Sequence, residues 1–132
     1  MKNVVLDSSQ LPNIILIDDE KMTLYLTQKI LLNYHPDFLI STFTSGRDAM
    51  IFLANQVSLN KTVVLLDINM PLYNGWDFLN DFSEADTICS VFMFTSSIDK
   101  LDMIKSESYN LVKGFISKPL TPQKIEQIIT NY

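Results

Sequence analysis

Five short apolar runs alternate with longer segments of helical pattern along this chain, and this alternation restricts its possible folds more than any other feature. Four of the runs are almost continuously apolar, as strands covered by helices on both faces are. The exception, "FLISTF", mixes polar and apolar residues, which is typical of an edge strand. Repeated strand–helix units predict an α/β fold: an open parallel sheet with helices on both faces and right-handed crossovers. The runs are residues 13–17, 38–43, 62–66, 90–94 and 114–117.

The segments between the runs carry helix signals. After residue 19, Met22, Leu26 and Ile30 recur at every fourth position, and Leu24 and Leu31 widen the stripe. We expect this stripe to face the core. The expected N-cap residues of the later helices are Ser45, Asn74, Ser97 and Thr121.

Length, charge and cysteine content limit the function further. The 132 residues fit one domain, which we expect over residues 12–132 after a short tail of residues 1–11. A net charge of -5 argues against nucleic-acid binding. The chain has no apolar run long enough for a membrane span and no signal peptide, so we expect a cytoplasmic protein. Cys89, the single cysteine, is predicted to be a core residue.

A polar residue follows four of the five runs at the point where each run ends. Asp18 and Asp19 follow the first run, Asp67 the third, Thr95 the fourth and Lys118 the fifth. Because the carboxyl ends of parallel strands share one edge of a sheet, these side chains are expected to meet in one crevice.

Three close carboxylates raise one another's pKa unless a cation neutralises them. With oxygen ligands alone, the expected cation is Mg²⁺, with Mn²⁺ or Ca²⁺ as alternatives. Lys118 would bind a phosphoryl oxygen as a point charge and Thr95 would donate a hydrogen bond to another. Asp67 is then the candidate nucleophile, forming an aspartyl phosphate.

The motifs "LIDDE", "LLDINMPLYNGWDFL", "FMFTSS" and "GFISKPL" resemble those of response-regulator receiver domains, the phosphoacceptor modules of two-component signalling. The resemblance covers the chain from about residue 12 to its end. It implies a doubly wound, flavodoxin-like sheet with strand order 2-1-3-4-5 and phosphorylation of Asp67. It also implies that Asp18, Asp19, Asp67 and the backbone carbonyl of Asn69 bind Mg²⁺.

The resemblance further implies a switch in which Thr95 moves toward the phosphoryl group while Phe115 turns inward. The Lys118–Pro119 peptide is cis in the family. Because residue 132 ends the last predicted helix, we expect a stand-alone receiver. Its expected partners are a histidine kinase or histidine phosphotransfer protein and a downstream protein, and it would be a monomer or a phosphorylation-dependent dimer.

Three other functions were weighed against this hypothesis. A receiver-like interaction module that works without phosphorylation would be favoured by a missing site residue, and all five are present. A phosphatase of the haloacid-dehalogenase type would need a second carboxylate where the chain has "DIN" (67–69). Flavin binding would need a phosphate-binding loop after the first run, where acids would instead repel the phosphate.

Overall fold

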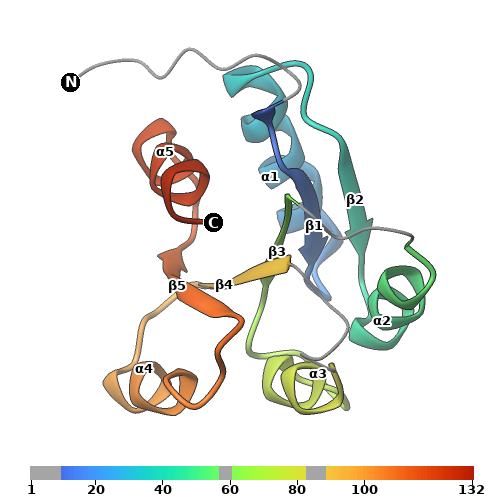
Figure 1. Cartoon of the computed structure of the whole chain (residues 1–132), viewed down its shortest axis with the longest axis vertical. Helices are drawn as coiled ribbons and strands as arrows, with labels where there is room; N and C mark the ends of the chain where they lie inside the picture. The colour runs from blue at the N-terminus through green and yellow to red at the C-terminus, as the bar shows by residue number, and fades with distance from the viewer. Residues whose placement is uncertain (1–9, 57–60, 83–88) are drawn as a thin grey trace.

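The computed structural model describes residues 10–56, 61–82 and 89–132, and its strands and helices alternate along the whole described chain. Figure 1 shows a central sheet with α1 and α5 on one side and α2, α3 and α4 on the other. The expected α/β architecture is therefore confirmed. The strands are β1 (Asn13–Ile17), β2 (Ile40–Phe43), β3 (Thr62–Leu66), β4 (Cys89–Thr95) and β5 (Val112–Ser117). The helices are α1 (Lys21–Tyr34), α2 (Gly46–Ala54), α3 (Gly75–Asp81), α4 (Lys100–Ser106) and α5 (Pro122–Asn131).

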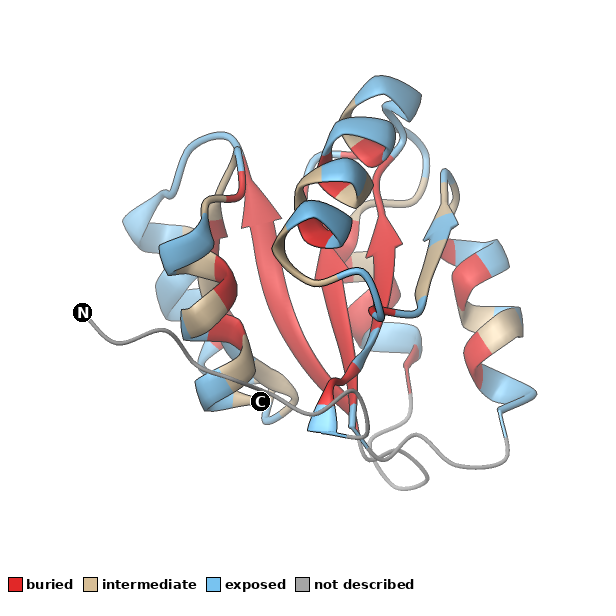
Figure 2. Cartoon of the chain, turned by 90° about the horizontal axis from the view of Figure 1, so that it is seen from above, coloured by how far each residue is buried: buried red, intermediate tan, exposed pale blue. Residues whose placement is uncertain are grey.

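All neighbouring strands of the sheet are parallel, in the order β2-β1-β3-β4-β5, as the family resemblance implied. Every residue of β3 and β4 is buried, which explains their continuous apolar character, and Figure 2 shows these central strands in red. Strand β2 lies at an edge and is only partly buried, as its mixed composition predicted. It begins at Ile40, two residues later than expected, and β5 begins at Val112, two residues earlier.

Successive strand residues point to opposite faces and build two separate cores. Ile15, Val64 and Met93 pack under α2 and α3. Ile14, Leu65 and Phe94 pack under α1 and α5. The second core also includes Leu11, the last residue of the expected tail, whereas residues 1–9 lie outside the described part of the chain.

The predicted core face of α1 is right for Leu24, Leu31 and the partly buried Ile30, and wrong for Met22 and Leu26. Met22 and Leu26 are 65% and 50% exposed, whereas the buried residues of the helix are Leu24, Thr27 and Leu31. Both sets have helical spacing, but the buried set follows the steps of three and four that keep to one side of a helix with 3.6 residues per turn. A strict step of four drifts around the helix, so that Met22 and Leu26 are exposed while Ile30 is partly buried against the core.

Three of the four predicted caps are confirmed. Ser45, Asn74 and Thr121 each accept a hydrogen bond from the backbone amide three residues later. Ser97 was wrong, because α4 begins two residues further on and Asp99 caps it by accepting from the Leu101 amide at 2.8 Å. Within the described residues, no helix has both the length and the apolar character that crossing a membrane requires.

Candidate functional site

The sheet brings the predicted site residues to its carboxyl edge through backbone hydrogen bonds at the strand ends. The Asp67 amide donates to the carbonyl of Ile17 at 3.0 Å, which fixes the end of β3 beside the end of β1. The Lys118 amide donates to the carbonyl of Thr95 at 2.8 Å and fixes β5 beside β4 in the same way. The order of the strands alone therefore places Asp18, Asp67, Thr95 and Lys118 along one edge.

Three carboxylates cluster there, because one oxygen from each of Asp18, Asp19 and Asp67 lies within 4.8 Å of the others. Asp18 and Asp67 are buried, and Asp19 is exposed at the mouth of the cluster. Asp18 is held by the backbone amide of Glu20, which donates to its Oδ1 at 2.9 Å. The cluster thus has a hydrogen-bonded, buried base and is open to solvent at Asp19.

The side chain of Lys118 brings a positive charge to the three carboxylates. Its Nζ lies 2.5 Å from Asp18 Oδ2 and 3.5 Å from Asp67 Oδ1. The same ammonium lies 5.6 Å from the centre of the Phe94 ring, within the range of a cation–π contact. Nothing in the sequence motifs pointed to Phe94, although it directly precedes Thr95 on β4.

The pKa of Asp67 is raised, first because burial disfavours its charged form and then because Asp18 and Asp19 repel it. Lys118 and a hydrogen bond from the Asn69 backbone act in the opposite direction and lower it. Asp67 is therefore a desolvated carboxylate beside one ammonium, a setting in which a carboxylate gains from an additional positive charge.

Thr95 and Phe115 lie on the neighbouring strands. Thr95 is 2% exposed, and its Oγ1 donates a hydrogen bond to the carbonyl of Ser97 at 3.4 Å. Phe115 is half-buried and packs against the core under α2 and α3. It also lines an open groove of about 420 Å³ together with Met103 and Tyr109. The motion of these two side chains stays a prediction.

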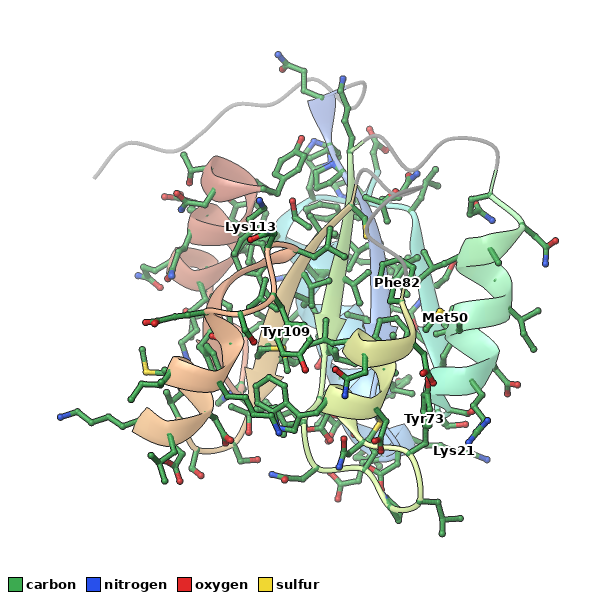
Figure 3. All side chains as sticks on the ribbon, turned by 60° about the horizontal axis from the view of Figure 1, so that its bottom comes forward. Lys21, Met50, Tyr73, Phe82, Tyr109 and Lys113 are labelled. Carbon is green, nitrogen blue, oxygen red and sulfur yellow. The ribbon has the colours of Figure 1, made fainter. Side chains whose placement is uncertain are left out.

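The loop after Asp67 is packed tightly against α2 and α3. The Tyr73 hydroxyl donates to Asp81 Oδ2 at 2.7 Å, and the Arg47 guanidinium lies 4.5 Å from the centre of the Tyr73 ring. Burial and the hydrogen bond to Asp81 raise the pKa of Tyr73 to about 12. Figure 3 shows Tyr73 beside α3, at the end of the molecule that carries the loop. Leu72, in the same loop, is fully exposed and has a left-handed φ of 70°.

The donor set of the cluster fits a hard divalent cation. It offers carboxylate oxygens that already lie close together, one of them on the exposed Asp19, and Mg²⁺ typically combines one or two carboxylates with water and phosphate oxygens. The Lys118–Pro119 peptide is cis, as the resemblance implied. All the predicted site residues except Phe115 are thus tied to the same strand-end cluster by contacts or backbone hydrogen bonds. Asn69 is joined to it through its backbone hydrogen bond to Asp67.

Known proteins resemble this chain in fold and sequence. A two-component response regulator from Cytophaga hutchinsonii is 28% identical, with a TM-score of 0.80 over 91% of this chain and 95% of that one. A response regulator receiver protein from Dyadobacter fermentans is 25% identical, with a TM-score of 0.78 over 89% and 94%. Response regulator SaeR from Staphylococcus aureus is 25% identical over 122 residues, 90% of this chain. The chain spans about half the length of SaeR, 49%.

The chain also matches a protein family over most of its length. The response regulator receiver domain matches residues 14–130, from the first strand to the last helix. The match includes every residue of the acidic cluster and its lysine. The chain therefore belongs to the response-regulator receiver domains of two-component signalling.

Proposed function

We propose that this receiver takes a phosphoryl group from a phosphohistidine of a histidine kinase or phosphotransfer protein onto Asp67, with Mg²⁺ bound by the acidic cluster. The observation that carries the proposal is the position of Asp67. It is buried, its pKa is raised, and it lies between two further carboxylates and one ammonium. A site of this kind can accept a phosphoryl group only if its own negative charge is balanced.

In the proposed reaction, an Asp67 carboxylate oxygen forms a bond to phosphorus while the P–N bond to the donor histidine breaks. The bonding electron pair leaves with the imidazole nitrogen. Mg²⁺, when bound, supplies positive charge to the phosphoryl oxygens. Asp18, Asp19, Asp67 and the carbonyl of Asn69 would hold it.

Lys118 and Thr95 would bind the product. The Lys118 ammonium already lies 3.5 Å from Asp67 Oδ1, so little movement would bring it to a phosphoryl oxygen on that residue. Thr95 would exchange its 3.4 Å hydrogen bond to Ser97 for one to a second phosphoryl oxygen. Phe115 would follow into the space that the hydroxyl leaves, and the surface of α4, β5 and α5 would carry the signal to a downstream protein.

The donor would approach over α1, next to the acidic cluster. The exposed side of this helix carries an apolar patch, with Met22, Tyr25 and Leu26 each at least half exposed. An apolar patch beside a reactive site is typical of a protein-binding surface. The exposure of Met22 and Leu26, which were predicted to face the core, thus supports a role for this side of α1 in binding.

The test is the intact mass of the protein after incubation with acetyl phosphate, with Mg²⁺ or with EDTA. We expect a single added phosphoryl group that requires Mg²⁺. Asp67→Asn, which is nearly isosteric, should form no adduct, whereas Asp37→Asn, an exposed aspartate after α1, should react like the wild type. Adduct formation by Asp67→Asn at the wild-type rate would show that the acceptor is another residue.

The absence of any adduct in the wild type would favour the second candidate, an interaction module that works without phosphorylation. The apolar patch on α1 is the observation that supports this candidate, because it would bind a partner in either case. Lys118→Ala separates the two further. We expect it to impair partner binding more than phosphorylation, because the lysine links the phosphoryl group to the β5–α5 loop.

A further inference from the structure

Lys124 binds the loop that carries Lys118. Its ammonium donates three hydrogen bonds: to the carbonyl of Ser117 at 2.9 Å, to the hydroxyl of Ser117 at 2.9 Å and to the carbonyl of Pro119 at 3.0 Å. An ammonium has three N–H donors, and all three are used here. The acceptors belong to the two residues that flank Lys118.

The place of Lys124 in α5 makes this arrangement informative. Thr121 is the N-cap of the helix and accepts from the Lys124 amide at 3.3 Å, so Lys124 occupies the third helical position. Glutamate or glutamine completes a capping box at that position, and a positive charge is unfavourable near a helix N-terminus. A residue that breaks a local preference indicates a role outside its own helix.

From these contacts we infer that Lys124 is a positioning residue for Lys118. The Lys118 backbone is held on one side by the hydrogen bond of its amide to Thr95, and the bonds from Lys124 fix the residues before and after it. The Lys118 side chain therefore starts from a fixed backbone and reaches Asp18 and Asp67 at 2.5 and 3.5 Å. The positioning of Lys118 by Lys124 does not depend on the proposed function. Its consequence, that Lys124 sets the rate at which Asp67 is phosphorylated, rests on that function.

The variant that tests it is Lys124→Gln. Glutamine removes the ammonium but fits the capping box of α5, so the helix should remain intact. Lys113→Gln is the matched control, because Lys113 is an exposed lysine on β5 whose ammonium has one 3.4 Å contact, to the carbonyl of Asn110. Figure 3 labels this residue. Both variants lose one positive charge.

The first readout needs neither metal nor phosphoryl donor. Amide hydrogen exchange of Lys118 should become about tenfold faster in Lys124→Gln, because the loop opens more often without its three bonds. The Asp67 amide, bonded to Ile17 in the centre of the sheet, should exchange as in the wild type. Lys113→Gln should change neither. Unchanged exchange at Lys118 would overturn the inference, even if the protein accepts no phosphate.

The second readout is the rate of phosphorylation by acetyl phosphate, measured in two backgrounds. Lys124→Gln should slow the reaction of the wild type about tenfold, since small displacements of a positioned group have large effects on rate. In Lys118→Ala the same change should have no further effect, because Lys124 acts through Lys118. An equal slowing in both backgrounds would show that Lys124 contributes charge or stability rather than position.

Discussion

Replacing Gly75 by alanine should destabilise this protein and displace Asp67, the proposed phosphoacceptor. Gly75 is the first residue of α3, and its amide donates to the carbonyl of Ile68 at 2.9 Å. A Cβ atom at this position would lie 2.7 Å from the carbonyl oxygen of Asp67 and 3.0 Å from the Cα of Ile68. Both atoms belong to the backbone, so no side-chain rotation can remove the clash.

The magnitude follows from these distances. Non-bonded atoms pack best at about 3.5–4.0 Å, so the helix and the loop must move apart by roughly half an ångström or more. Overpacking of a rigid site costs about 1–3 kcal/mol, and we expect about 2 kcal/mol here because both clashing atoms are backbone. With an unfolding entropy of about 2 cal/mol/K per residue, that loss lowers Tm by about 7 °C for a chain of this length.

The assay is urea unfolding, followed by the fluorescence of Trp76, the only tryptophan, and by circular dichroism. Gly114→Ala is the control, because its Cβ would lie 3.6 Å from the Phe92 ring, an ordinary contact distance. We expect Gly75→Ala to unfold at a lower urea concentration and to be phosphorylated more slowly, and Gly114→Ala to change neither. Equal midpoints for the two variants would refute the argument from close approach.

Three further outcomes are expected. Leu72→Gly should stabilise the fold by about 0.5 kcal/mol in urea unfolding, because glycine relieves the left-handed φ of 70° and the exposed leucine loses no packing. Because burial raises the pKa of Asp67, its ionisation destabilises the folded state, and this contribution grows as pH rises from the ordinary aspartate range toward neutrality. Asp67→Asn should therefore be more stable than the wild type at pH 7 without Mg²⁺, by on the order of 1 kcal/mol, with a smaller difference at pH 4 and a smaller gain from added Mg²⁺. Burial also raises the pKa of the Cys89 thiol to about 11, so a thiol reagent at pH 8 should label it at least tenfold more slowly in the native protein than in urea.

The strand ends were predictable because topology alone decides where they lie. In a parallel sheet, every carboxyl end reaches the same edge, so a polar residue after each apolar run is enough to place Asp18, Asp67 and Lys118 together. No knowledge of side-chain conformations was needed. The mixed composition of residues 38–43 identified the edge strand by the same kind of argument, because an edge strand is covered less than a central one.

The helix faces were less predictable, because several stripes on one helix can satisfy the same spacing. In α1, the predicted stripe was too wide, because Leu24 and Leu31 are buried whereas Met22 and Leu26, apolar residues of the same stripe, are exposed. Only the position of the sheet decides between them. The α4 cap failed for a related reason: Ser97 and Asp99 are both good caps, and the length of the β4–α4 connection selects Asp99. The unusual position of Lys124 could have been recognised in the sequence, because a capping box has an acid or an amide at the third position of a helix.

The charges of the site explain why the proposed reaction would need both a cation and a well-placed lysine. Three carboxylates and one ammonium leave two net negative charges in a largely buried cluster, and these are the charges that one divalent cation would neutralise. A phosphoryl group on Asp67 then adds negative charge beside Lys118, the ammonium nearest to that residue in the described structure. In the proposed reaction, Lys118 would therefore bind Asp18 and Asp67 before phosphorylation and the phosphoryl group after it. A lysine with two successive partners works only if its backbone stays fixed while its side chain moves, and the bonds from Lys124 to Ser117 and Pro119 provide that fixed point.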